Sequence, residues 1–126
     1  MLNILYANPY SLLDYTSGSS KSIRLILKGF SNLGCNVEAI FCTTSYSKTG
    51  YLNTCSFLNN SNRSVKLNHI NLDGIKCNII NSNHWDRRKL NDSEQRLFLK
   101  ETISLIKKRK IDLIISWGNL RFCLLY

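Results

Sequence analysis

Three short runs of the sequence have residue types and spacing that could serve chemistry, and the first is Thr16-Ser17-Gly18-Ser19-Ser20. Small polar residues directly before a helix leave backbone N–H groups exposed, which suits phosphate and other anions. The run matches neither the dinucleotide pattern G-x-G-x-x-G nor a Walker motif. Two interpretations therefore stay open: Gly18, Ser19 and Ser20 contact a ligand, or the run only caps the helix that follows.

The second run is His84-Trp85-Asp86-Arg87-Arg88, in a loop before a second expected helix. Arg87 and Arg88 could bind a phosphate through their guanidinium groups, and Trp85 could stack on the face of a sugar ring. Of the two histidines, His84 is the better candidate for a polar role, because His69 lies in an alternating strand pattern. The alternative is that Trp85 packs as a lid on the core while the charged side chains face solvent.

The third run is Trp117-Gly118-Asn119, which directly follows an expected strand. Its position at the carboxyl end of that strand places it opposite the run around Gly18. Asn119 could donate a hydrogen bond to a sugar hydroxyl, or it could cap a following helix. Both interpretations are compatible with the sequence.

Neither a metal site nor a disulfide framework is indicated. The five cysteines are odd in number and no two are spaced as C-x-x-C. Cys42 and Cys77 fall in apolar, strand-like runs, where thiols act as small buried hydrophobes. We expect free thiols and a reducing compartment such as the cytoplasm. The carboxylates are scattered, so no catalytic acid or base is identified.

The elements that must position these runs alternate between strand and helix. Residues 2–7 and 36–42 are short apolar runs typical of buried strands. Between them, residues 21–33 carry apolar side chains at helical spacing, with Ser19 or Ser20 able to cap the start and Gly34 placed to end the helix. Strand, helix and strand in this order normally build a parallel pair, and ligands bind beyond the carboxyl ends of such strands.

The rest of the chain continues the pattern after an Asn-rich excursion over residues 43–64, with a short helix near residues 51–58. Asp73-Gly74 between two alternating runs predicts a hairpin, which either extends the sheet or forms a flap beside it. Residues 91–109 predict a helix that opens on a capping box of Asn91 and Glu94, and residues 111–116 predict a strand. We therefore expect a single α/β domain over residues 1–126: a Rossmann-like three-layer domain with a mainly parallel sheet and a β-hairpin insertion.

The positive net charge of the chain indicates an anionic partner. The formal net charge is +9, from 17 Lys and Arg against 8 Asp and Glu, which attracts nucleic acid, anionic lipid or phosphorylated substrates. The densest cluster, Lys107-Lys108-Arg109-Lys110, ends an expected helix, where cations also favour the helix dipole. No signal peptide and no membrane span is expected, because the first residues lack a basic start and no apolar run is long enough.

Two segments resemble the N-terminal domain of family-four glycosyltransferases of the GT-B fold. The first is ILYANPYSLLDYTSGSSKSIRLILKGFSNLGCNVEAIF, where Arg24-Leu25-Ile26-Leu27 and Gly34-Cys35-Asn36-Val37 match the family's helix and turn. The second is HWDRRKLNDSEQRLFLKETISLIKKRKIDLIISWGN. There Asp112 matches a Pro-Asp pattern in which Ile111 replaces the proline, and Gly118-Asn119 stands where many members have two glycines. The order and spacing of these motifs carry the resemblance.

The resemblance implies an acceptor-side domain that faces a C-terminal domain binding a nucleotide-sugar donor, with no cofactor and no obligatory metal in this part. The implied cleft residues are Gly18, Ser19, Ser20, Trp117, Gly118 and Asn119. The acceptor would be a glycan, a lipid-linked molecule or similar. We expect a truncated chain that is inactive alone, located in the cytoplasm or peripherally on the inner face of an anionic membrane, with no nucleic-acid partner. The alternative, favoured by charge, is a small basic nucleotide- or nucleic-acid-binding α/β module.

Overall fold

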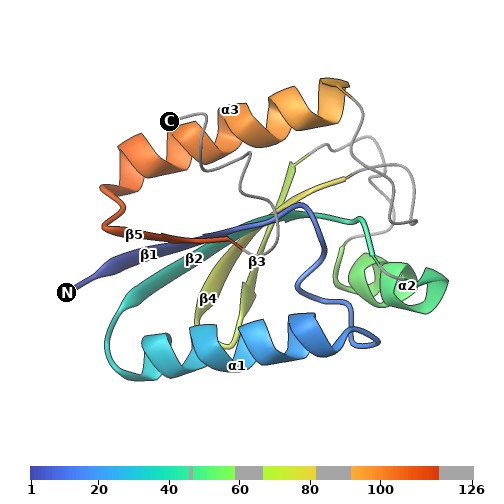
Figure 1. Ribbon diagram of the computed structural model, residues 1–126, viewed down its shortest axis with the longest axis horizontal. Helices are drawn as coiled ribbons and strands as arrows, with labels where there is room; N and C mark the ends of the chain where they lie inside the picture. The colour runs from blue at the N-terminus through green and yellow to red at the C-terminus, as the bar shows by residue number, and fades with distance from the viewer. Residues whose placement is uncertain (46, 59–66, 82–91, 117–126) are drawn as a thin grey trace.

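The computed structural model describes residues 1–45, 47–58, 67–81 and 92–116. Strands and helices alternate along the described chain except at one hairpin (Figure 1). In chain order the elements are β1 Asn3–Ala7, α1 Gly18–Asn32, β2 Asn36–Cys42, α2 Lys48–Phe57, β3 Leu67–Leu72, β4 Ile75–Ile80, α3 Asp92–Arg109 and β5 Leu113–Ile115.

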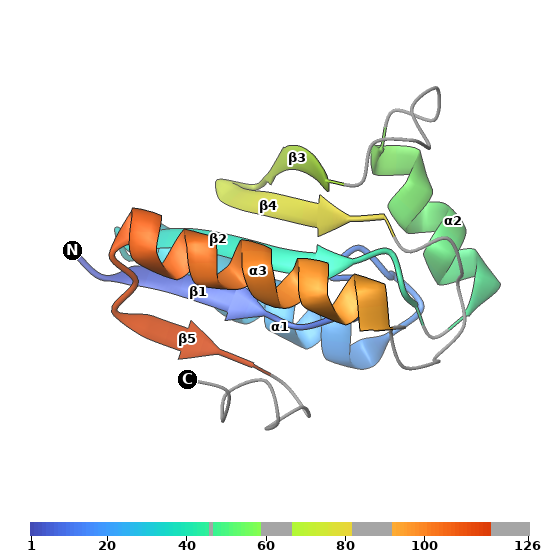
Figure 2. The same cartoon turned by 90° about the horizontal axis from the view of Figure 1, so that it is seen from above.

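All five strands belong to one mixed sheet in the order β3-β4-β2-β1-β5. The strands β4, β2, β1 and β5 are parallel, and β3 is antiparallel to β4. Helices α1 and α3 cover opposite faces of this sheet (Figures 1 and 2). The predicted α/β class with a mainly parallel sheet is confirmed, and the arrangement is compatible with a Rossmann-like fold.

The predicted hairpin is present at Asp73-Gly74. Both turn residues have positive φ, +51° at Asp73 and +86° at Gly74, as a tight turn of this kind requires. β4 pairs in parallel with β2 from Glu38 opposite Lys76 to Cys42 opposite Ile80. The hairpin therefore extends the sheet and is not a flap beside it.

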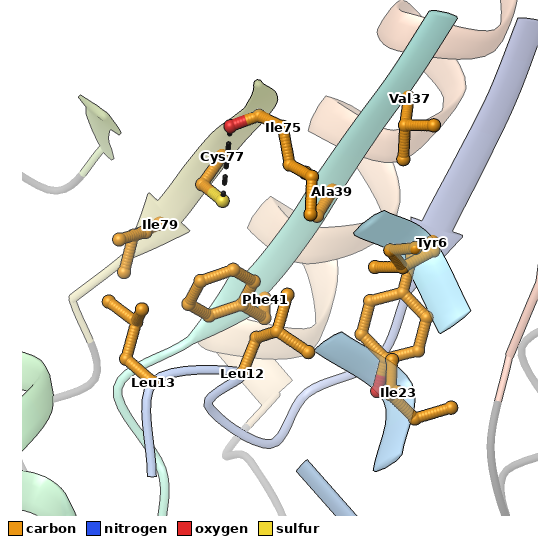
Figure 3. Packing of buried hydrophobic residues seen from close by; sticks show 11 residues of the cluster. Tyr6, Leu12, Leu13, Ile23, Val37, Ala39, Phe41, Ile75, Cys77 and Ile79 are labelled. Atoms are coloured by element: carbon orange, nitrogen blue, oxygen red, sulfur yellow. Dashed lines mark hydrogen bonds between the residues drawn. The ribbon is translucent and has the colours of Figure 1, made fainter. Parts of the chain in front are cut away.

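The core has two halves because successive side chains of a strand point to opposite faces of the sheet. In β2, Val37, Ala39 and Phe41 belong to the half beneath α1, whereas Ile40 and Cys42 belong to the half beneath α3. Figure 3 shows the first half, in which side chains of β1, β2, β4 and α1 meet Leu12 and Leu13 from the loop after β1. These two leucines tie that loop to the core.

The ends of α1 are set by local hydrogen bonds. Ser17 is the N-cap, and its hydroxyl accepts from the backbone N–H of Ser20 at 3.3 Å. The cap expected at Ser19 or Ser20 is therefore wrong by two to three residues, because several small polar residues precede the helix and each fits the same role. Gly34 ends the helix with a φ of +92°, and Cys35 N–H donates to the Phe30 carbonyl at 3.1 Å, which is the Schellman arrangement.

The strand expected over residues 111–116 is shorter, and its first residue, Ile111, still belongs to the end of α3. Ile111 N–H donates to the Ile106 carbonyl at 3.4 Å. Asp112 exchanges two hydrogen bonds with Asn3: its N–H donates to the Asn3 carbonyl at 2.8 Å, and its carboxylate accepts from the Asn3 N–H at 2.8 Å. Regular pairing with β1 then runs from Leu113 to Ile115.

A chain of polar side chains crosses the face of the sheet that α3 covers. Arg109 Nε donates to Glu38 Oε1 at 3.1 Å, and Asn78 Nδ2 donates to Glu38 Oε2 at 3.0 Å. Asn78 Oδ1 lies 2.8 Å from His69 Nδ1. His69 thus has a structural partner across the hairpin, in agreement with its position in an alternating strand.

Candidate functional site

The strand order creates a switch point at the carboxyl ends of β1 and β5. From β1 the chain passes through α1 to β2 on one side, and from β4 it passes through α3 to β5 on the other side of β1. In open α/β sheets, ligands bind beyond the carboxyl ends of the strands at such a switch point. The loop from Asn8 to Ser17 and Ser116 follow these strand ends.

The loop after β1 is anchored by backbone hydrogen bonds to the last residue of β2 and to the segment that follows it. Ser11 N–H donates to the Thr44 carbonyl at 2.7 Å, and Cys42 N–H donates to the Pro9 carbonyl at 3.0 Å. Tyr10 and Thr44 form a parallel bridge beyond the ends of the strands. The loop is therefore a rigid continuation of the sheet, and it fixes where α1 begins.

A buried carboxylate joins this loop to α2. The Asp14 carboxylate accepts from Thr16 N–H at 2.9 Å and from the Thr16 hydroxyl at 2.5 Å, and Asp14 is fully buried. Because the Thr16 hydroxyl donates to Asp14, it must accept from the Ser47 hydroxyl, which lies 2.8 Å away. Ser47 in turn caps α2 by accepting from Gly50 N–H at 3.0 Å. The starts of α1 and α2 are thus linked through side chains.

The N-terminus of α1 presents two backbone donors to solvent. Gly18 and Ser19 are exposed, and within the described residues their N–H groups donate no hydrogen bond. A Cβ added at Gly18 would meet nothing within 4 Å, so packing does not require a glycine there. Exposed N–H groups at the positive end of a helix can bind an anion.

Ser20, also expected in the cleft, is committed to the protein itself. It is buried, and its hydroxyl donates to the Ser11 carbonyl at 2.9 Å. Ser11 also shares a hydrogen bond of 2.5 Å with the hydroxyl of Thr54 in α2. Ser20 therefore positions the loop, and a ligand at the helix N-terminus would meet Gly18 and Ser19.

At the other side of the switch point, β5 ends beside Ser116. The Ser116 hydroxyl oxygen is buried and has no hydrogen-bond partner, which within the described ranges holds for no other buried side-chain N or O atom. A buried hydroxyl without a partner carries a desolvation penalty of about 1–3 kcal/mol, and such atoms often mark a functional site. The expected site residues Trp117, Gly118 and Asn119 follow it and lie outside the described residues.

An exposed aromatic pair, which the sequence alone did not indicate, joins the loop before α1 to the end of α2. The rings of Tyr15 and Phe57 have centroids 6.1 Å apart and are inclined by 46°. The Arg24 guanidinium lies 4.4 Å from the centroid of the Tyr15 ring, and its Nη1 donates to the Leu12 carbonyl at 2.5 Å. Burial lowers the pKa of Arg24, while the charges of Tyr15 and Asp14 oppose that change. The pair offers a fixed apolar surface on which a sugar ring could stack.

The four cysteines that the structure describes lie outside this candidate site. Cys35, Cys42, Cys55 and Cys77 are free thiols, and burial raises the pKa of Cys42 and Cys77 well above the ordinary thiol value. Among the residues that the structure describes, no group of three His, Cys, Asp or Glu side chains is arranged to hold a metal ion.

The second run of candidate residues, His84, Trp85, Arg87 and Arg88, lies outside the described residues, and so does Asn91 of the expected capping box. Of the described helices, none has the length and apolar character needed to cross a membrane.

No protein-family model, no curated protein and no solved structure matches this chain. The geometry of the carboxyl edge is therefore the basis for assigning a function.

Proposed function

We propose that this chain is the acceptor-side domain of a GT-B glycosyltransferase, which transfers a sugar from a nucleotide sugar held by a second, C-terminal domain. The observation that carries the proposal is the pair of unpartnered N–H groups of Gly18 and Ser19, held at the carboxyl edge of a parallel sheet beside its switch point. The resemblance of the two sequence segments supports it. A GT-B enzyme needs donors of this kind where diphosphate and acceptor meet.

In this proposal the described residues have distinct roles. The N–H groups of Gly18 and Ser19, at the positive end of α1, bind a phosphate oxygen of the donor or of a phosphorylated acceptor. Tyr15 and Phe57 offer the surface on which a sugar of the acceptor stacks. Asp14 and Ser20 hold the loop in place, so that the donors are already oriented before a ligand arrives. Trp117, Gly118 and Asn119, with His84, Trp85, Arg87 and Arg88, are proposed as further contacts.

The acceptor is proposed to be a glycan or a lipid-linked glycan. Transfer requires the C-terminal donor-binding domain, so the described domain is expected to bind ligands without turning them over. Adding a donor-binding domain in trans and measuring sugar transfer from a radiolabelled nucleotide sugar would test this requirement directly.

Replacing Gly18 by proline tests the proposed binding role without disturbing the fold. Proline is favoured at the first position of a helix, where its missing N–H is not needed. Ser17 already has the extended conformation that a residue before proline requires, with φ −97° and ψ 122°. Gly18→Pro therefore deletes one candidate ligand donor while the protein stays folded.

The measurement is a titration with glucose 1-phosphate and with UDP-glucose, followed by backbone amide NMR. The amide signals of Gly18 and Ser19 should shift in the unaltered protein, and Gly18→Pro should weaken binding about tenfold, as expected for one charge-assisted hydrogen bond. Ser19→Ala, which keeps its N–H, should bind nearly normally. If neither probe moves these signals, or if Gly18→Pro binds as well as the unaltered protein, the proposal is wrong.

A second candidate is a small nucleotide- or nucleic-acid-binding module, which the same helix N-terminus and the net charge of +9 favour. Such a module would bind the nucleotide without the sugar as tightly as the nucleotide sugar, or would bind single-stranded nucleic acid with a steep salt dependence. The glycosyltransferase proposal instead requires that phosphorylated sugars compete at Gly18 and Ser19.

A further inference from the structure

Strand β3 lies at the edge of the sheet and lacks the features that usually protect an edge strand. Among the described strands it pairs only with β4, and Figure 2 shows it at the margin of the sheet. Proteins commonly guard such an edge with a lysine, a proline or a bulge. The sequence of β3, LNHINL, has no charged residue and no proline. Its pairing with β4 runs without interruption from Leu67 opposite Ile80 to Leu72 opposite Ile75, so β3 has no bulge.

The backbone of β3 has polar groups that point away from β4. A two-residue turn is flanked by a hydrogen-bonded pair, here Leu72 and Ile75, and such pairs alternate along an antiparallel ladder. Ile70 therefore bonds to β4, whereas the N–H and C=O groups of His69 and Asn71 face outward. Neither of these two N–H groups donates to any residue that the structure describes. They can accept a further strand.

The side chains of β3 differ between the two faces of the sheet. Ile70 and Leu72 are partly buried against the half of the core beneath α1. His69 and Asn71 alternate with them and are exposed on the other face. Asn71 Oδ1 accepts from Gly74 N–H at 3.0 Å, so the NH2 group of the Asn71 amide is left as a donor.

His69 carries the complementary group, an acceptor. Its Nδ1 lies 2.8 Å from Asn78 Oδ1, and Asn78 Nδ2 donates to Glu38 and to the Ala39 carbonyl. The neutral imidazole must then donate from Nδ1, which leaves Nε2 as an acceptor. One exposed face of β3 thus has an acceptor at His69 and a donor at Asn71.

We propose that β3 pairs in the antiparallel sense with β3 of a second copy of this chain, around a two-fold axis at Ile70. An axis perpendicular to the sheet keeps each face on its own side, and Ile70 then lies opposite Ile70 of the second copy. His69 lies opposite Asn71 of the second copy, and the outward N–H and C=O groups of these residues form the main-chain hydrogen bonds. The Asn71 amide donates to His69 Nε2 on one face, while the two Ile70 side chains meet on the other.

Charge and register favour a second copy as the occupant of this edge. The net charge of +9 makes two copies repel each other, and β3 is a strand without charge through which they can approach. The next register in one direction places Ile70 opposite Asn68 and His69 opposite His69, so neither pair is matched. The next register in the other direction brings Asp73 into the ladder, where its φ of +51° does not fit an extended strand. A peptide of unrelated sequence would lack the matched pairs.

The first experiment is sedimentation equilibrium of the 126-residue chain over a range of concentrations, which should show an equilibrium between monomer and dimer. Asn71→Pro removes an outward N–H from each copy and leaves the bonds to β4 in place, since proline is tolerated at an edge strand. It should raise the dissociation constant about thirtyfold, as expected for the loss of two hydrogen bonds. The control is Gly18→Pro at the start of α1, which should leave the dissociation constant unchanged.

A second pair of variants tests the axis through charge. Ile70→Lys sets two like charges opposite each other and should raise the dissociation constant at least about tenfold. Leu25→Lys is its control, because it adds the same charge at a residue of α1 that is 63% exposed. Circular dichroism should show all four variants folded.

Cross-linking tests the register. Residues that lie opposite each other without hydrogen bonds have Cα atoms about 4.5 Å apart, which is close enough for a disulfide. Ile70→Cys should therefore form a disulfide between two copies under mild oxidation, and Asn71→Cys should not. Mass spectrometry of the linked peptides identifies the bond.

Three outcomes would overturn the proposal: a chain that stays monomeric up to about 1 mM, equal effects of the variants and their controls, or a disulfide through Asn71→Cys in place of Ile70→Cys. The two-fold axis reverses the strand direction, so the α1 N-termini of the two copies lie at opposite ends of the joined sheet. Failure to dimerise therefore leaves the sugar-phosphate titration at Gly18 unaffected, and the two proposals fail separately.

Discussion

The Asp14 carboxylate fills the space in which a side chain at Gly50 would have to lie. Gly50 is in the first turn of α2, and Asp14 belongs to the loop between β1 and α1. The close approach means that the absence of a side chain at residue 50 lets a helix N-terminus seat directly on the buried carboxylate. This contact, together with the hydrogen bond between Thr16 and Ser47, fixes the loop that ends at the candidate site.

Replacement of Gly50 by alanine should therefore destabilise the protein, although alanine is the better helix former by about 1 kcal/mol. The new methyl group overlaps the Asp14 carboxylate, and relief of such overpacking costs about 1–3 kcal/mol. Urea unfolding measures the change. Gly29→Ala is the control, because an added Cβ there meets nothing within 4 Å, and it should stabilise the protein by about 0.5–1 kcal/mol. Stabilisation by Gly50→Ala as well as by Gly29→Ala would show that the Asp14 contact is not close.

The buried thiols of Cys42 and Cys77 should not react with alkylating reagents in the folded protein. Burial raises the pKa of Cys77 from 9.0 to about 12, and it raises that of Cys42 as well, so the reactive thiolate is scarce at pH 8. Iodoacetamide at that pH should modify the partly exposed Cys35 and Cys55 first, as read by mass spectrometry of the peptides. Cys42 and Cys77 should react only when denaturant is added, and early labelling of either would contradict the burial.

The same shift makes stability fall at high pH. Between pH 9 and about 12 the unfolded chain loses the Cys77 proton, whereas the folded state keeps it. Ionisation therefore stabilises the unfolded chain in this window, and the free energy of unfolding falls as the pH rises through it. We expect the free energy of unfolding to decline above pH 9 by up to about 1.4 kcal/mol per pH unit for this thiol. Replacement of Cys77 by alanine or serine should make the free energy of unfolding fall less steeply with pH. Urea unfolding at several pH values measures this dependence.

The polar chain across the sheet fixes which nitrogen of His69 carries its proton. Asn78 Nδ2 donates to Glu38 and also to the Ala39 carbonyl at 3.1 Å, so the oxygen of the Asn78 amide must face His69. Neutral His69 must then donate from Nδ1. Nitrogen NMR of the imidazole should show the Nδ1–H form at pH 8. Glu38→Gln replaces one accepting oxygen with an NH2 group, which then faces the donor of Arg109 or of Asn78. This replacement should lower the free energy of unfolding by about 1–3 kcal/mol and weaken the preference for the Nδ1–H form. A dominant Nε2–H form would show the amide to be reversed.

Most of the fold could be predicted because its signals are local. Strand β2 matches the expected residues 36–42, and the positive φ values at Asp73 and Gly74 were predictable from the residue pair alone. The features that differ depend on contacts distant in sequence. Whether the hairpin joined the sheet was decided by the packing of Ile75, Cys77 and Ile79 beneath α1, which no local pattern encodes.

The candidate site also has features that local sequence predicts and features that depend on distant contacts. The exposure of Gly18 and Ser19 follows from their place in the first turn of α1, and exposed N–H groups in this run were expected. The burial of Ser20 was not expected, because it depends on the Ser11 carbonyl nine residues away. The pairing of Tyr15 with Phe57 and the contact of Asp14 with Gly50 join segments more than thirty residues apart, so spacing along the chain gave no sign of them.

The strand order has a consequence for how the chain acquires its structure on the ribosome. β1 pairs with β2, some thirty residues later, and with β5, more than one hundred residues later. The unit of β1, α1 and β2 can form early, since its contacts are short-range, whereas the edge of β1 that faces β5 stays without a neighbour until residue 113 has emerged. Among the described strands, β1 thus waits longest for its second neighbour, and its open edge offers a chaperone a binding site on the nascent chain during that interval.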